Sequence, residues 1–316
     1  MAIAFVFPGQ GSQAVGMGKA LADRFAAARA VFAEVDAALG QKLSQLMWEG
    51  PEAELTLTEN AQPALMTVSM AAIRVLKAEH GITAGDIAKF VAGHSLGEYS
   101  ALAAAGTFSL GDAARLLKTR GKAMQAATPV GIGAMAALLG LDFADAAEVA
   151  AEAAQGDVCQ AANDNSAGQV VVSGHRAAVE RALDIAKAKG AKRAILLPVS
   201  APFHCALMQP AADTMAEALS KVTMKAPVVP LIANVVAGPI GDPAEIRRRL
   251  VEQVTGTVRW RECVAYMAAH GVKLFCEVGA GKVLTGLAKK NAPGAAALAI
   301  GTPDDMAAAA TQLKQG

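Results

Sequence analysis

Short apolar runs alternate with longer amphipathic stretches along most of the chain. Runs that are apolar at nearly every position predict strands buried on both faces. We expect such strands at 2–7, 89–93, 228–233, 273–278 and 296–300. Apolar residues at helical spacing predict helices at 19–39, 61–79, 96–105, 110–126, 243–254, 260–270 and 282–290. This alternation is typical of an α/β protein with a mainly parallel sheet that is flanked by helices.

The pattern changes between residues 129 and 199. Strands are predicted at 134–141, 158–162, 169–173 and 194–199, with helices at 142–154 and 175–189. The middle two strands are joined by residues 163–168, which are rich in Asn, Asp, Ser and Gly and therefore favour a hairpin turn. The resulting βαββαβ order is that of a ferredoxin-like unit. We expect residues 129–199 to form a small insert in a larger discontinuous domain, 1–128 and 200–316.

One predicted turn carries a serine between two glycines. The apolar strand that ends at Gly93 is followed by Ser95, Gly97 and an Ala-rich helical stretch. This Gly-x-Ser-x-Gly spacing is that of a nucleophile elbow, in which small neighbours permit the sharp turn. Free N–H groups at the start of the helix could stabilise an oxyanion. Ser95 could also merely cap the helix, but the strand before it and the helix after it favour catalysis.

A serine nucleophile needs a base, and histidine is the usual one at neutral pH. The candidates are His80, His94, His175, His204 and His270. His204 follows a strand in a loop, where functional groups are often placed. The alternative is the α/β-hydrolase order of serine, acid and histidine, which selects His270 with Asp242 as the acid. Both schemes are open at this stage.

Composition limits the classes of function. Of 316 residues, 53% are hydrophobic and 18% charged, which indicates a large globular core. Lys plus Arg (29) nearly balance Asp plus Glu (28), which argues against nucleic acid as a partner. The scattered cysteines lack metal-ligand spacing, so we expect no metal site and a reducing compartment. No signal peptide or membrane-length apolar run is evident, so we expect a cytoplasmic protein without membrane contact.

Five motifs resemble, in the same order, those of the malonyl-CoA:acyl carrier protein transacylases. They are FPGQGSQ at 7–13, GHSLGEY at 93–99, TRGK at 119–122, NDNSAGQVV at 163–171 and FHC at 203–205. The resemblance covers essentially the whole chain. It implies a hydrolase-like core with a ferredoxin-like insert, which agrees with the elements predicted above.

The resemblance also implies roles for individual residues. Ser95 would be the nucleophile that becomes malonylated, and His204 the general base and acid. Gln253 corresponds to the family residue whose carbonyl oxygen orients the histidine. The sequence departs from the family nearby, since Gly256-Thr257 stand where Asn-Pro is frequent. Phe203 stands where a small residue is common.

The same resemblance implies how the acyl group is bound. The backbone N–H groups of Gln10 and Leu96 would form the oxyanion hole. Arg120 would pair with the free carboxylate of the malonyl group.

The expected reaction is ping-pong transfer of malonyl from malonyl-CoA to the phosphopantetheine thiol of acyl carrier protein, for fatty-acid biosynthesis. No permanently bound cofactor is expected, and the protein is expected to be a monomer with acyl carrier protein as its partner. A serine hydrolase or thioesterase is the first alternative, because an elbow cannot distinguish water from a thiol as acceptor. A malonyl transferase subunit of a malonate decarboxylase is the second.

Overall fold

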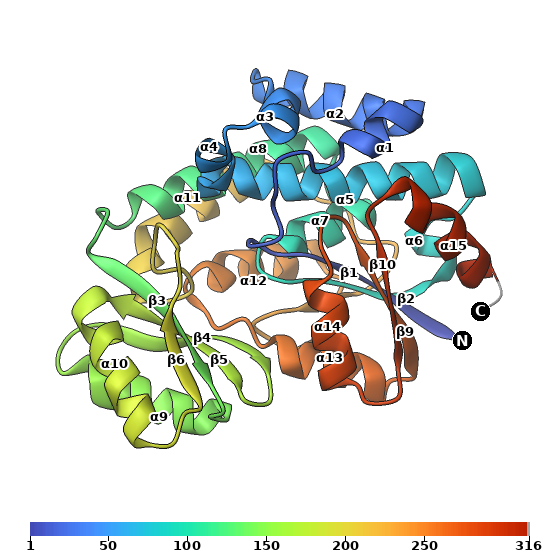
Figure 1. Ribbon diagram of the computed structural model, residues 1–316. Helices are drawn as coiled ribbons and strands as arrows, with labels where there is room; N and C mark the ends of the chain where they lie inside the picture. Colours follow the sequence, from blue (N-terminus) through green and yellow to red (C-terminus); the bar gives the residue numbers. More distant parts are fainter. Residues whose placement is uncertain (315–316) are drawn as a thin grey trace.

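A six-stranded sheet forms the centre of the structure, a computed structural model that describes residues 1–314 (Figure 1). Its strand order is β10-β9-β1-β2-β7-β8, and every neighbouring pair is parallel except β7 and β8. The strands are β1 (Ala2–Phe7), β2 (Ala88–Gly93), β7 (Leu231–Ala233), β8 (Gly238–Ile240), β9 (Val272–Val278) and β10 (Ala296–Ile300). The predicted α/β class with a mainly parallel sheet is confirmed.

Helices cover both faces of this sheet because its central strand is apolar on both sides. Ile3, Phe5 and Phe7 of β1 face one core, whereas Ala4 and Val6 face the other. The first core is closed mainly by α2 (Ala26–Leu39), α5 (Thr58–His80), α7 (Gly97–Ala104), α8 (Leu110–Ala126), α11 (Gln209–Ser220), α12 (Pro243–Thr255) and α15 (Pro303–Lys314). The second is closed by α13 (Trp260–Ala269) and α14 (Val283–Asn291), which lie together beside β9 in Figure 1.

Residues 133–196 form a second, four-stranded antiparallel sheet with its own core. Its elements are β3 (Gly133–Leu139), α9 (Phe143–Ala154), β4 (Cys159–Ser166), β5 (Gln169–His175), α10 (Arg176–Ala188) and β6 (Arg193–Leu196). They follow one another in the predicted order, and the strand order in space is β4-β5-β3-β6. Figure 1 shows this unit to one side of the larger sheet.

Strand β4 of the smaller sheet is bonded to Val258 and Arg261 of the larger unit, next to and at the start of α13. The N–H of Asp164 donates to the carbonyl oxygen of Val258 at 2.9 Å, and the N–H of Val258 donates to that of Ala162 at 2.9 Å. The buried carboxylate of Asp164 also accepts from Arg261, at 2.8 Å. These bonds fix the position of the smaller unit beside the mouth of the site described below.

Several boundaries and short elements differ from the sequence prediction. The helix expected at 19–39 is interrupted at Phe25, which adopts an extended conformation between α1 (Lys19–Arg24) and α2. The prediction also lacked β8 and α15, together with α3 (Leu43–Glu49), α4 (Glu52–Thr56), α6 (Ala84–Ile87) and the 3₁₀ turn Ala206–Met208. Within residues 1–314, no helix combines the length and the apolarity that crossing a membrane requires.

Candidate active site

Ser95 lies in a sharp turn between β2 and α7. Its backbone adopts a positive φ of 52°, which is uncommon for a residue with a side chain. A Cβ atom at Gly93 would collide with the backbone of Gly97, and one at Gly97 would collide with the carbonyl group of Phe7. Only glycine therefore fits at either position. The Ser95 hydroxyl does not cap α7, because the N-cap residue is Leu96 and no side chain caps it.

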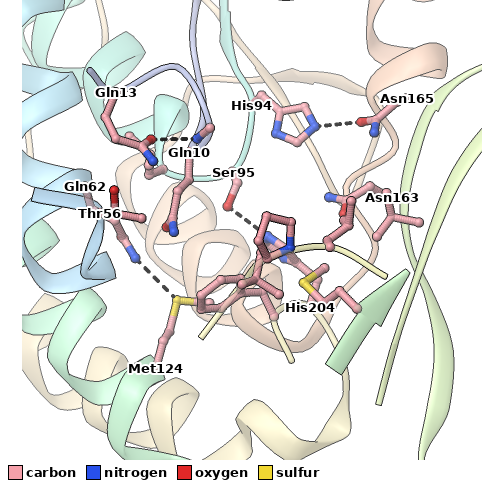
Figure 2. A pocket seen from close by; sticks show the side chains of 18 of the residues that line it. Gln10, Gln13, Thr56, Gln62, His94, Ser95, Met124, Asn163, Asn165 and His204 are labelled. Carbon is pink, nitrogen blue, oxygen red and sulfur yellow. Dashed lines mark hydrogen bonds between the residues drawn. The ribbon is translucent and has the colours of Figure 1, made fainter. Parts of the chain in front are cut away.

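The Ser95 hydroxyl is paired with His204. Its Oγ lies 2.8 Å from His204 Nε2, and Figure 2 shows the two side chains pointing toward each other. His204 Nδ1 lies 2.9 Å from the backbone carbonyl oxygen of Gln253. Because a carbonyl oxygen only accepts hydrogen bonds, the proton sits on Nδ1 and leaves Nε2 free to accept from the serine.

The environment keeps His204 neutral. Burial, together with the nearby positive charge of Arg120, lowers the pKa of His204 to about 3. An imidazole with this pKa is unprotonated at neutral pH, which is the form that a general base requires.

This lowered pKa of His204 predicts that kcat/KM does not fall on the acid side of neutral pH. A histidine with an ordinary pKa would lose its function as a base as the pH falls through about 6.5. Since protonation of His204 is shifted toward pH 3, we expect kcat/KM to be constant between about pH 5 and pH 7. Initial rates with a thioester substrate at saturating acceptor measure this directly. An inflection near pH 6.5 would contradict the assignment of a buried, neutral base.

Arg120 places a buried positive charge beside the hydroxyl group of Ser95. The residue lies on α8 and is only 1% exposed. Its Nη2 lies 3.1 Å from Ser95 Oγ and 2.8 Å from the side-chain oxygen of Gln253, while Nη1 donates to Gln62 at 2.8 Å. Within residues 1–314 its Nε has no hydrogen-bond partner, and no carboxylate forms an ion pair with it. The guanidinium can therefore receive an anionic group.

Ser95, His204 and Arg120 open onto one cavity of about 550 Å³. Gln10 and Leu96, the two residues expected to form the oxyanion hole, also line it. Among residues 1–314, neither the backbone N–H of Gln10 nor that of Leu96 donates a hydrogen bond to a backbone or side-chain acceptor. Both N–H groups can therefore donate to a ligand. The rest of the wall is partly polar and partly apolar. The apolar part comes from α8, from β3 and β5 of the smaller sheet and from the segment after β6, through Met124, Met135, Val171, Leu197, Val199 and Phe203.

The alternative pair of His270 and Asp242 lies outside this cavity. His270 is exposed at the end of α13, where its Nδ1 lies 2.8 Å from the carbonyl oxygen of Tyr266. Asp242 caps α12 by accepting from the N–H of Glu245 at 2.9 Å. Both side chains therefore have structural roles at helix ends, and the scheme based on the α/β-hydrolase order is wrong for this chain.

Residues that the sequence did not single out complete the site. Asn234, at the end of β7, accepts from the N–H of Ser95 and donates to the carbonyl oxygen of Gly93, both at 2.8 Å. Gln62 on α5 holds Arg120. Neither residue lies in a motif that the sequence analysis recognised, so no sequence signal pointed to them.

The fold and the elbow serine define an acyl transferase, and the family model described as "Acyl transferase domain" matches residues 4–302. The chain is 51% identical to the malonyl CoA-acyl carrier protein transacylase of Escherichia coli (strain K12), over 97% of this chain and 98% of that protein. The corresponding protein of Bacillus subtilis (strain 168) is 47% identical over 99% and 98%. The chain belongs to this family of malonyl CoA-acyl carrier protein transacylases.

Solved structures agree with this relationship. The crystal structure of an acyl-carrier-protein-S-malonyltransferase from Bartonella henselae matches with a TM-score of 0.97 and 58% identity, covering 99% of this chain and all of that one. A malonyl-transacylase in complex with a type II polyketide acyl carrier protein matches with a TM-score of 0.95 and 43% identity, covering 99% and 100%.

Proposed function

We propose that this protein transfers a malonyl group from malonyl-CoA to the phosphopantetheine thiol of acyl carrier protein, as one step of fatty-acid biosynthesis. The observation that carries the proposal is the convergence of two groups, His204 and Arg120, on the oxygen of Ser95. Ser95 Oγ lies 2.8 Å from a neutral histidine nitrogen and 3.1 Å from a buried guanidinium nitrogen. The names of the relatives, one of them solved with an acyl carrier protein, support the same substrate and partner.

The first half of the reaction acylates Ser95. His204 Nε2 takes the hydroxyl proton as Ser95 Oγ attacks the thioester carbonyl carbon. The negative charge that develops on the carbonyl oxygen is stabilised by the N–H groups of Gln10 and Leu96. As the tetrahedral intermediate collapses, the C–S bond breaks and the sulfur of CoA takes the proton from His204. The product is a malonyl ester of Ser95 and free CoA.

The second half reverses these steps with a different thiol. His204 Nε2 takes the proton of the phosphopantetheine thiol, and the sulfur attacks the ester carbonyl carbon. When the intermediate collapses, the bond to Ser95 Oγ breaks and His204 returns its proton to that oxygen. The main-chain carbonyl oxygen of Gln253 accepts the proton on His204 Nδ1 in a hydrogen bond. The neutral imidazole therefore has the same tautomer at the start of each half of the reaction.

Arg120 supplies selectivity for the malonyl group. Its planar guanidinium can bind a carboxylate through two parallel hydrogen bonds and keeps its charge when buried. In the free enzyme one of its Nη2 protons is directed at Ser95 Oγ. Once this oxygen is part of an ester it is a weaker acceptor, so that proton becomes available to the malonyl carboxylate.

Release of CoA distinguishes transfer from hydrolysis. We expect malonyl-CoA alone to give a burst of about one CoA per enzyme, followed by slow release, because the acyl-enzyme waits for a thiol. Addition of phosphopantetheinylated acyl carrier protein should then give continuous turnover. Rapid, continuous CoA release without any acceptor would favour the thioesterase alternative instead. A thiol acceptor other than acyl carrier protein would favour the malonate decarboxylase alternative.

The remaining assignments extend this proposal. We assign residues 129–199 to a ferredoxin-like insert, which the strand order β4-β5-β3-β6 supports, and residues 1–128 with 200–316 to the catalytic domain. A monomeric state, a cytoplasmic location and the lack of a permanently bound cofactor stay predictions from the sequence.

A further inference from the structure

A buried carboxylate lies beneath the nucleophile turn, and the mechanism above gives it no role. Glu98 follows Ser95 in the first turn of α7 and is 1% exposed. One carboxylate oxygen accepts the backbone N–H of Asn234, and the other accepts the side-chain NH₂ of Gln253. A carboxylate in the protein interior is costly unless its oxygens are hydrogen-bonded, so this arrangement calls for an explanation.

The two partners of Glu98 hold the backbone of Ser95 at both ends. The side-chain oxygen of Asn234 accepts the N–H of Ser95 at 2.8 Å. The side-chain nitrogen of Gln253 donates to the carbonyl oxygen of Ser95 at 2.9 Å. A backbone with positive φ persists only where its surroundings hold it in place. These two amides provide such a constraint, and Glu98 binds both residues.

Glu98 also favours the orientation of the Gln253 amide in which its oxygen faces Arg120. An ionised carboxylate only accepts hydrogen bonds, so the NH₂ group of Gln253 must point toward it. The oxygen of the same amide then points toward Arg120 Nη2, at 2.8 Å. If the amide were reversed, its NH₂ group would meet the N–H donors of Arg120. Glu98 and the carbonyl oxygen of Ser95 thus both hold the Gln253 amide in the orientation that presents its oxygen to Arg120.

The surroundings of Glu98 suit its ionised form. Burial raises the pKa of Glu98 to about 8, which by itself would favour the protonated acid at neutral pH, whereas the hydrogen bonds from Asn234 and Gln253 and the charge of Arg120 lower the pKa. We infer the ionised form from the hydrogen-bond geometry, because a protonated carboxyl group would need an acceptor for its O–H. Both carboxylate oxygens accept from N–H donors, and among residues 1–314 neither oxygen is paired with an acceptor that could take a carboxylic-acid proton.

We propose that Glu98 is a positioning residue, which fixes the Ser95 turn through Asn234 and Gln253 and orients Arg120 through the Gln253 amide. It touches neither substrate nor the reacting atoms. Because it acts through Arg120, its removal should change the choice between acyl groups as well as the rate. This role rests on the proposed function, since its readout is the preference for malonyl-CoA over acetyl-CoA.

The test is the nearly isosteric change Glu98→Gln. A glutamine offers one acceptor and one donor, so either Asn234 or Gln253 must then face a donor. We expect kcat/KM for malonyl-CoA to fall by about 10- to 150-fold, the effect of losing one hydrogen bond to a charged group. Acetyl-CoA does not need Arg120, so its kcat/KM should fall less, and the malonyl preference should drop by about tenfold or more.

Glu277→Gln is the matched control. Glu277 is also fully buried, and it accepts the N–H groups of Leu284 and Thr285 at 3.1 and 2.7 Å. It lies on β9, does not line the cavity, and caps α14 instead. We expect this change to lower the melting temperature without altering the malonyl preference, which separates a loss of stability from a loss of orientation.

A double-mutant cycle with Gln253→Met tests whether Glu98 acts on the malonyl preference through the Gln253 amide. Gln253→Met removes the amide but keeps the main-chain carbonyl that binds His204. We expect it to lower the malonyl preference by itself, and Glu98→Gln to change the preference by less than about threefold in that background. Equal losses for both substrates in Glu98→Gln, or full additivity in the double variant, would overturn the proposal.

Two further results keep the test decisive. If Glu98→Gln does not fold, an unchanged malonyl preference in Gln253→Met alone would overturn the orienting role. If the wild-type protein forms no malonyl-serine at all, the proposed function has failed and not the role of Glu98.

Discussion

Replacing His204 by alanine is expected to slow the acylation of Ser95 by about 10²- to 10⁴-fold, the usual contribution of a general base. The Ser95 hydroxyl would keep its contact with Arg120 but would lose His204 Nε2, the one neutral nitrogen among residues 1–314 that is hydrogen-bonded to it and can take its proton. Single-turnover acylation, followed by quenching and intact-mass detection of the acyl-enzyme, measures this rate without interference from the second half-reaction.

His270→Ala provides the matched control for this prediction. His270 is exposed, contacts the carbonyl oxygen of Tyr266 and lies outside the cavity, so its removal should leave the rate within about twofold of wild type. The opposite result, with a slow His270→Ala variant and a normal His204→Ala variant, would reinstate the serine–acid–histidine order and exclude His204 as the base.

Arg120→Ala is expected to lower kcat/KM for malonyl-CoA but not for acetyl-CoA. Malonyl differs from acetyl by one carboxylate, and this group would be buried without a partner once the guanidinium is gone. Removing one member of a buried charged pair costs about 2–5 kcal/mol, which corresponds to a fall of about 30- to several-thousand-fold in kcat/KM for malonyl-CoA. Acetyl-CoA has no such carboxylate and should be used as well as before or better.

Two companion variants sharpen this result. Arg120→Lys should recover only part of the loss, because an ammonium group keeps the charge but cannot offer the planar pair of donors. Arg115→Ala, on the same helix, removes an exposed side chain that pairs with Asp112 and should change neither substrate. Equal losses for malonyl-CoA and acetyl-CoA in Arg120→Ala would instead mean that the arginine has a structural role.

The larger elements of the fold could be predicted because their patterns are local and long. The strand at 2–7 is apolar at every position, and α8 is signalled by Ser109, whose hydroxyl accepts the N–H of Asp112 as an N-cap. The missed elements lack such signals. The three residues of β8 include a proline, and the break at Phe25 carries neither glycine nor proline. Their conformations are set by tertiary packing.

The nucleophile could be predicted from five adjacent residues, whereas Gln253 was indicated only by the family resemblance and Asn234 by no sequence signal. The elbow is a local signal, since its two glycines and the serine lie together in sequence. Asn234 and Gln253 reach Ser95 from 139 and 158 residues away, so only the folded chain brings them together. The choice between His204 and His270 likewise needed the structure. The sequence indicates that His204 follows a predicted strand and that His270 ends a predicted helix, but not which of them lies beside Ser95.

Intact-mass spectrometry after mixing with malonyl-CoA tests the central assignment most directly. The wild-type protein should gain the mass of one malonyl group and lose it again when phosphopantetheinylated acyl carrier protein is added. Ser95→Ala should show no adduct under the same conditions, because Ser95 Oγ is the oxygen paired with His204. A Ser95→Ala protein that still gains one malonyl group would contradict the account, since the nucleophile would then lie elsewhere in the chain.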